Sequence, residues 1–257
     1  MENYFIGIAI LVCSAVLTLF IKNQPMKLKI SSIGAFIASC FTVCASIKAL
    51  LTTTLSATLH LGSIFQNVSF VLDNLSAFFV IFISIMSTLA IIYSNGYLDK
   101  YIKQGKEVTA HCIFLIMLFA AMLLVVTIQN ALMFLIAWEL MSLASFFLVI
   151  FEHDKKEVIK SGIKYLVYMH VSVIFIILFF VLLSTNAQSL DFAYFKQALE
   201  GNIDLANTIF IMGFVGFGIK AGFVPFHNWL PDAHPKAPSH VSAMMSGVMI
   251  KTGIYGI

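Results

Sequence analysis

Residues 218–257 decide the fold of this chain, and they read GIKAGFVPFHNWLPDAHPKAPSHVSAMMSGVMIKTGIYGI. Both ends of this stretch are apolar, whereas its middle holds four of the five prolines in the whole sequence. Proline removes a backbone donor and clashes with the preceding turn, so a continuous helix cannot pass through prolines this dense. We therefore expect two membrane helices, at 206–224 and 240–257, joined by a rigid linker. The first should break near Gly222 and Pro225.

The rest of the sequence is strongly apolar. Of its 257 residues, 60% are hydrophobic and 11% are charged, whereas soluble domains have about 25% charged residues. A helix needs about 20 mostly apolar residues to cross a bilayer. Eight segments meet this condition, at 4–21, 30–51, 74–93, 111–128, 130–151, 163–184, 206–224 and 240–257. The sequence thus predicts an all-α membrane protein, a multi-span helical bundle of about eight transmembrane helices with a broken seventh helix.

The lysines predict the orientation of this bundle. All 15 basic residues are lysines, and eleven of them follow the first, third, fifth and seventh predicted helices. The opposite side has only Lys48 and Lys196. Because lysine-rich loops stay in the cytoplasm, we expect a multi-pass protein of the cell inner (cytoplasmic) membrane with its N-terminus outside. The first apolar run follows Glu2 and no positive segment, which indicates a retained helix instead of a signal peptide.

Several classes of function are excluded by composition. The basic residues form no patch or reader motif, so we expect no nucleic-acid partner. The four cysteines form no CxxC pair, which argues against an iron–sulfur cluster or a structural disulfide. The linker histidines have no carboxylate or cysteine set to complete a metal site. We therefore expect no cofactor and no metal, and a lipid bilayer as the surroundings.

Three charged residues lie inside apolar runs, namely Glu139, Lys220 and Lys251. A charge near the bilayer centre costs about 2.5–3.5 kcal/mol on insertion scales, so such residues usually face a protein interior or a water-filled path. The alternatives are a glutamate at the membrane interface and lysines that extend to it. Gly213 and Gly216 share a predicted helix face with Lys220, and small residues let a neighbouring helix approach closely. We predict that all three charges serve proton translocation.

Histidines add to this prediction, because imidazole titrates near neutral pH. His240, Met244, Gly247 and Lys251 fall at helical spacing and predict one continuous face. We expect His227 and His240 to lie near the site of proton uptake. His170 lies within the apolar run of the 163–184 helix. It is either a proton relay partner or a hydrogen-bonded core residue. For each histidine the alternative is a structural role.

The other loops carry weaker signals. Alternation around FQNVSFVLD predicts a short strand or hairpin within 52–72, and 185–205 predicts a short surface helix. Asp73 precedes an apolar run and is a predicted helix N-cap.

The segment from 218 to 257 resembles the seventh and eighth transmembrane helices of the antiporter-like, proton-translocating membrane subunits of complex I and of group 4 membrane-bound hydrogenases. Within this family, the sequence of the segment is most similar to the hydrogenase-4 component B and formate hydrogenlyase subunit 3 type. The motifs WEL at 138–140, LDNLSAFF at 72–79 and YSNGYL at 93–98 also match. The resemblance covers most of the chain. Multi-subunit sodium/proton antiporters contain related subunits.

This resemblance implies specific roles. Glu139 matches the glutamate of the fifth helix, Lys220 the lysine of the broken seventh helix, and Lys251 a lysine of the eighth helix. It implies that Glu139 pairs with protonated Lys220, and that the proton then moves to Lys251. Members of the family are non-catalytic membrane subunits without a redox cofactor. Their implied partners are other membrane subunits of a hydrogenase or complex I-like assembly and, indirectly, peripheral redox subunits.

The resemblance also divides the chain. Residues 1–110 hold the N-terminal helices 1–3, and 111–257 hold helices 4–8, the first antiporter-like repeat. Members have a second, inverted repeat, so we expect a chain truncated at its C-terminus. The function predicted is that of a proton-translocating membrane subunit of a respiratory redox complex. A subunit of a multi-subunit sodium/proton antiporter and a structural membrane protein with buried charges are the alternatives.

Overall fold

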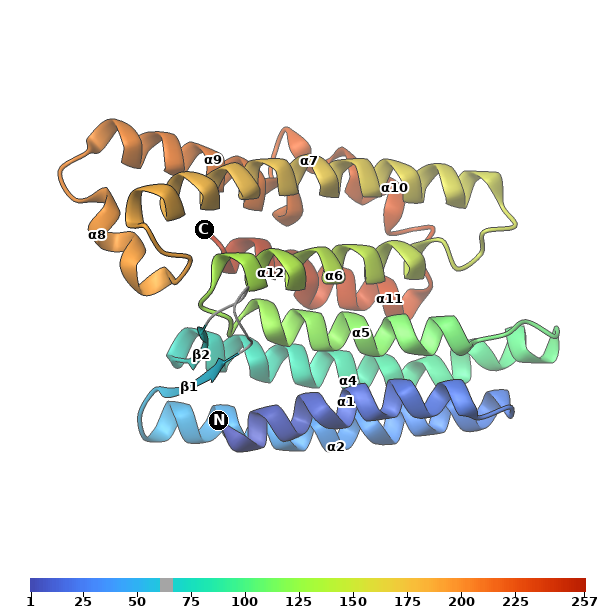
Figure 1. The fold of residues 1–257 in the computed structure, drawn as a ribbon. Coiled ribbons are helices and arrows are strands. Elements are labelled where there is room, and N and C mark those ends of the chain that lie inside the picture. Colours follow the sequence, from blue (N-terminus) through green and yellow to red (C-terminus); the bar gives the residue numbers. More distant parts are fainter. Residues whose placement is uncertain (61–66) are drawn as a thin grey trace.

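The structure, a computed structural model, describes residues 1–60 and 67–257. Long helices run side by side along one axis (Figure 1). They are α1 (Glu2–Phe20), α2 (Gln24–Leu51), α4 (Asn74–Lys103), α5 (Thr109–Val125), α6 (Ala131–Val149), α7 (Lys156–Ala187) and α9 (Ile203–Ala221). Among the described residues, 6 helical segments are long and apolar enough to cross a membrane, and α5 is a shorter apolar helix. The predicted all-α, multi-span bundle is confirmed.

The seventh helix is broken where the sequence predicts. Helix α9 ends at Ala221, and Gly222 follows in a left-handed conformation with φ of 74°. Glycine takes this conformation without steric cost, which is why helices often end at it. The backbone N–H of Phe223 then donates to the carbonyl of Gly218 at 2.9 Å. Short helical turns, η2 (Phe226–Trp229) and α10 (Leu230–Ala233), form the linker.

The eighth predicted helix forms in three pieces. They are α11 (Ser239–Met244), the π-helical turn η3 (Met245–Met249) and α12 (Ile250–Tyr255). A π turn places one extra residue in the helix and therefore rotates everything after it relative to everything before it. This rotation decides where Lys251 lies.

A β-hairpin and two short helical turns cover the end of the bundle that also carries both termini (Figure 1). Strands β1 (Leu55–His60) and β2 (Asn67–Leu72) pair antiparallel. The turns are η1 (Phe192–Tyr194) and α8 (Phe195–Leu199). The predicted hairpin and surface helix are confirmed, although residues 61–66 of the hairpin region lie outside the described residues. Asp73 caps α4 as predicted, because its carboxylate accepts the backbone N–H of Ser76 at 2.7 Å.

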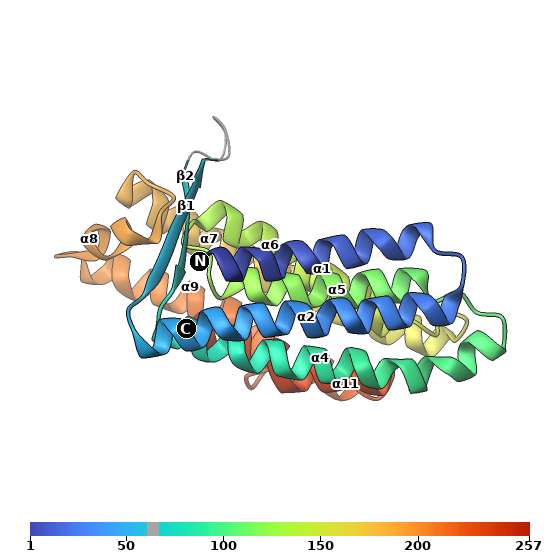
Figure 2. The same cartoon turned by 90° about the horizontal axis from the view of Figure 1, so that it is seen from below.

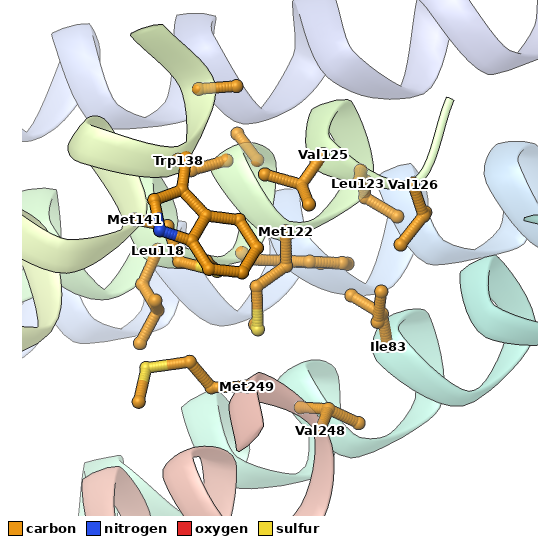
Figure 3. Close-up of a cluster of buried hydrophobic side chains, with 14 of the residues drawn as sticks. Ile83, Leu118, Met122, Leu123, Val125, Val126, Trp138, Met141, Val248 and Met249 are labelled. Carbon is orange, nitrogen blue, oxygen red and sulfur yellow. The ribbon is translucent and has the colours of Figure 1, made fainter. Parts of the chain in front are cut away.

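The helices stack in layers across the bundle. The α1–α2 pair lies at one side and the α7–α9 pair at the other, with α5 and α6 between them (Figure 1; Figure 2 gives the view from below). Helix α1 packs on α5, α5 on α6, α6 on α7, and α7 on α9. Figure 3 shows that Trp138 and Met141 of α6 meet Met122 of α5 and Met249 of η3 in the buried centre. The π turn therefore lies against the core.

Candidate functional site

Lys220 is the central residue of the site, and its side chain is 0% exposed. It lies in the last turn of α9, where the free carbonyls of the helix end carry partial negative charge and stabilise a cation. The predicted helix face of Gly213 and Gly216, upstream of Lys220, packs against α7. A methyl group built on Gly216 would meet the Cγ1 of Ile176 at 2.7 Å, so α7 approaches α9 closely there. Ser172 of α7 donates to the carbonyl of Gly216 at 2.6 Å.

Two hydroxyl groups bind the Lys220 ammonium. Its Nζ donates to Ser142 Oγ at 3.0 Å and to Tyr165 Oη at 3.4 Å. Ser142 donates its own proton to the carbonyl of Trp138 at 3.0 Å. Tyr165 Oη lies 2.6 Å from Ser145 Oγ, which itself donates to the carbonyl of Met141 at 2.8 Å. Because Tyr165 can then donate to Ser145, both hydroxyls are free to offer lone pairs to the lysine.

Aromatic rings complete the walls of the lysine site. Nζ of Lys220 lies 5.8 Å from the ring centroid of Trp138 and 5.8 Å from that of Tyr165. At this distance the electron-rich ring faces attract a cation weakly. The lysine is therefore held by neutral groups and by a helix end.

The predicted direct ion pair between Glu139 and Lys220 is wrong. In the part of the chain that the structure describes, no carboxylate lies within ion-pair distance of Lys220. Glu139 is partly exposed, and it lies three residues before Ser142 on α6. Three residues are just under one helical turn, so Ser142 takes the position next to the ammonium and Glu139 acts on Lys220 through space.

The linker returns to close the broken helix end. Trp229 is fully buried and donates its Nε1–H to the carbonyl of Ile219 at 3.0 Å. The same carbonyl accepts the backbone N–H of Gly222 at 3.2 Å, so two donors meet at this end of α9. The indole also packs on Tyr165, with 5.1 Å between ring centroids. One tryptophan therefore links the helix break to the side chain that binds Lys220.

Ion pairs fix the same linker to α7. Asp232 pairs with Lys164 at 2.5 Å, and Lys236 pairs with Glu157 at 2.9 Å. Both pairs are partly exposed and each contributes about 0–1 kcal/mol. Their effect is to hold the position of the linker.

The predicted continuous face from His240 to Lys251 is wrong. His240 and Met244 are buried, whereas Lys251 is exposed and donates to the carbonyl of Ser246. The π turn η3 inserts an extra residue between the two halves of the segment, so Lys251 turns away from the His240 face. No buried partner in the described chain holds its ammonium.

The remaining predicted residues lie apart from the lysine site. His170 is exposed, and its Nδ1 lies 2.9 Å from the carbonyl of Leu166 in its own helix. Tyr165 is the residue of α7 that binds Lys220, and it lies on a different face of this helix from His170. His227 is half-buried in η2, directly after the helix break, and its Nδ1 has no partner among the described residues.

His240 instead has a partner that sequence reasoning missed. Its Nε2 lies 2.7 Å from Nε2 of His111 in the first turn of α5. Sequence reasoning also missed Ser142 and Tyr165. Ser142 had a signal, because it follows Glu139 at i+3 and so shares its helix face. Neither His111 nor Tyr165 had one, since their importance depends on tertiary contacts.

Charged groups at the lysine-rich end, where the loops after α1, α4, α6 and α9 lie, form their own pairs. Lys155 and Tyr101 hydrogen-bond Glu152 and lower the pKa of its carboxyl from the ordinary value of 4.5. A hydrogen bond and the charge of Lys106 likewise lower the pKa of the Asp154 carboxyl. These loop carboxylates are ionised at neutral pH.

Comparison with known families agrees with the fold and the sequence motifs. Residues 128–257 match the family described as "NADH:quinone oxidoreductase/Mrp antiporter, TM". Residues 58–105 match the family described as "NADH-Ubiquinone oxidoreductase (complex I), chain 5 N-terminus".

Individual relatives include subunits of redox complexes and of an antiporter. The chain is 42% identical over 193 residues to hydrogenase-4 component B of Escherichia coli, which covers 75% of this chain and 28% of that protein. It is 28% identical over 186 residues to NADH-quinone oxidoreductase subunit M of Rickettsia felis, covering 72% of this chain and 36% of that one. It is 33% identical over 201 residues to Na(+)/H(+) antiporter subunit A1 of Staphylococcus haemolyticus, covering 76% and 24%.

A solved structure shares the fold. The chain superposes on a chain of the membrane-bound sulfane sulfur reductase, an archaeal respiratory membrane complex, with a TM-score of 0.82 and 24% sequence identity. The match covers 97% of this chain and 39% of the other. The sequence thus spans between about a fifth and two fifths of the length of the proteins that it resembles.

Proposed function

Because this chain belongs to the NADH:quinone oxidoreductase/Mrp antiporter transmembrane family, we propose that it is part of a proton-translocating membrane subunit of a respiratory redox complex. The observation that carries the proposal is Lys220, a fully buried amine held by the hydroxyls of Ser142 and Tyr165 at the broken end of α9. The similarity to hydrogenase-4 component B favours a membrane-bound hydrogenase type of complex.

Lys220 is suited to hold a proton and to give it up. Taking an ammonium out of water is costly unless an opposite charge compensates, and this site offers neutral hydroxyls and a helix end instead. The protonated state is therefore only weakly stabilised, so a modest change nearby can displace the proton. Lys220 binds the hydroxyls of Ser142 and Tyr165, and Tyr165 is hydrogen-bonded in turn to Ser145, so the amine can pass a proton to the Tyr165–Ser145 pair.

Glu139 is the residue that we propose sets the proton affinity of Lys220. Its partly exposed carboxylate lies one turn from Ser142 and attracts the ammonium without touching it. Because Lys220 is buried away from water, this attraction is screened less than between two charges in solution. Withdrawal or neutralisation of the Glu139 charge by a neighbouring subunit would weaken the hold on the proton.

Lys251 is the proposed next acceptor. Its exposure on α12 places its ammonium on a surface of this chain, where a further part of the protein or a neighbouring membrane subunit can pack. We propose that His227 and His170 assist at the two flanks of the path. We further propose that residues 111–257 form an antiporter-like repeat and that residues 1–110 form an N-terminal unit. The protein would lie in an inner membrane with its N-terminus outside. Peripheral redox subunits would act on it indirectly.

The test is Lys220→Met in the full-length protein assembled with its native complex. Methionine keeps much of the volume of lysine and removes the titratable amine. Inside-out vesicles are energised with the electron donor of the complex, and proton uptake is followed with a pH-sensitive dye. We expect uptake to fall at least tenfold. Lys160→Met is the matched control, because Lys160 is exposed on α7. Unchanged uptake in Lys220→Met would overturn the proposal.

A sodium/proton antiporter subunit is the second candidate, favoured by the similarity to Na(+)/H(+) antiporter subunit A1. The same vesicles separate the two. If the chain is part of a sodium/proton antiporter, an imposed sodium gradient should drive proton movement without any electron donor. Donor-dependent proton uptake that persists in sodium-free medium supports the redox-complex reading.

A further inference from the structure

A cavity of about 420 Å³ opens at the lysine-rich end, between the start of α5 and the end of α6. Its lining combines charged side chains, among them Glu107 and Asp154, with three phenylalanines, Phe114, Phe147 and Phe151. His111 is also in its wall. His111 is only 4% exposed, so it is a buried residue of the cavity wall.

Behind His111 lies His240, which is 1% exposed. Their Nε2 atoms are 2.7 Å apart, a hydrogen bond between two buried imidazoles. Phe151 packs on His111 with ring centroids 4.7 Å apart, and Tyr97 of α4 packs on His240 at 5.1 Å. The pair thus connects the cavity on one side with the helices of the interior on the other.

The hydrogen bond between the two imidazoles limits how many protons their Nε2 atoms can hold. One Nε2 must bear a proton and the other must accept it, so the two rings cannot both be protonated at Nε2. The remaining ring atoms, both Nδ1, are buried and have no partner among the described side chains and backbone. A buried polar atom without a partner costs about 1–3 kcal/mol, which calls for a role or for a water molecule. These two atoms are the free ends of a two-ring chain.

We propose that His111 and His240 form a proton-loading pair that takes protons from this cavity into the bundle; this inference rests on the proposed function. A proton from water in the cavity binds Nδ1 of His111. The proton on Nε2 of His111 then passes to Nε2 of His240. His240 releases its Nδ1 proton to water on the interior side. One proton arrives, one leaves, and no covalent bond other than N–H changes.

The route leads toward the lysine site along one structural segment. His240 lies in the first turn of α11, which continues into η3, where Met249 Sδ lies 3.9 Å from Tyr165 Oη. Tyr165 in turn binds Lys220. The pair is therefore joined by contiguous structure to the amine that we propose to switch.

The experiment compares His111→Gln, His240→Gln and Lys220→Met in the assembled full-length complex, with proton uptake and redox turnover measured in the same vesicles. Glutamine can keep a hydrogen bond between the helices but cannot take up a proton. We expect both glutamine variants to lose at least tenfold in proton uptake at unchanged assembly. His60→Gln on the opposite, exposed hairpin is the control and should match the wild type.

The outcomes separate the two claims. If Lys220→Met abolishes uptake while both glutamine variants keep it, the loading pair is refuted and the proposed function stands. If Lys220→Met keeps uptake, the proposed function itself fails. Should a glutamine variant not assemble, His111→Ala with added imidazole takes its place, because the cavity can admit the free base. Restored uptake then supports the pair, and an assembled variant that imidazole does not restore contradicts it.

Discussion

Ser142 and Lys220 are 78 residues apart in sequence, and their side chains meet at 3.0 Å in the buried centre of the bundle. The serine lies just under one turn after Glu139, so α6 presents to the lysine first a neutral hydroxyl and only then a carboxylate. The amine is consequently held without a contacting counter-ion. In this arrangement, Glu139 influences the proton affinity of Lys220 without contacting it.

Ser142→Ala should weaken the binding of protonated Lys220. A hydrogen bond to a charged group is worth about 1.5–3 kcal/mol, and each 1.4 kcal/mol corresponds to about tenfold in a rate or equilibrium constant. We expect proton uptake to change by tenfold or more. Ser184→Ala is the control, because the hydroxyl of Ser184 bonds only a carbonyl of its own helix. Equal uptake in the two variants would show that the serine contact has no function.

Trp229→Phe should destabilise the broken end of α9. The change removes the side-chain donor that reaches the carbonyl of Ile219 and leaves it only the backbone N–H of Gly222 at 3.2 Å. The loss of one such hydrogen bond costs about 0.5–1.5 kcal/mol. Trp138→Phe is a matched comparison, because the indole N–H of Trp138 has no partner among the described residues. Thermal unfolding of the purified complex should show the larger loss for Trp229→Phe. The reverse order would contradict the assigned contact.

Gly216→Ala should separate α7 from α9. The added methyl group would meet the backbone N of Ile176 at 3.1 Å as well as its side chain, and overpacking of this kind typically costs about 1–3 kcal/mol. Gly96→Ala is the control, since a methyl group there meets nothing within 4 Å. We expect a lower melting temperature for Gly216→Ala alone, measured in detergent.

Glu152→Gln should remove a part of the stability that depends on pH. Lys155 first, and then Tyr101, lower the pKa of this carboxyl in the folded protein. Its contribution is therefore present above the pKa of the unfolded chain and is lost as the pH falls through the folded pKa. The melting-temperature difference between wild type and Glu152→Gln should be largest near pH 7 and shrink below pH 4.5, the ordinary pKa of glutamate. A difference that grows on acidification would contradict this sign.

Much of the fold follows from the sequence because bilayer length and proline chemistry act locally. The apolar runs place the helices, and Gly222 with the dense prolines places the break in α9. The details of the site depend on tertiary contacts that no local pattern encodes. Ser142 took the place expected of Glu139 because one helix turn separates them, and the π turn at 245–249 turned Lys251 away from His240. A π turn leaves no clear mark in a run as apolar as AMMSGVMI.

We propose that Lys220 carries the translocated proton. The most direct measurement is the number of protons moved per electron transferred by the assembled full-length complex, compared between wild type and Lys220→Met. We expect electron transfer to continue in Lys220→Met while this ratio falls by the whole contribution of this subunit. An unchanged ratio in Lys220→Met would contradict it.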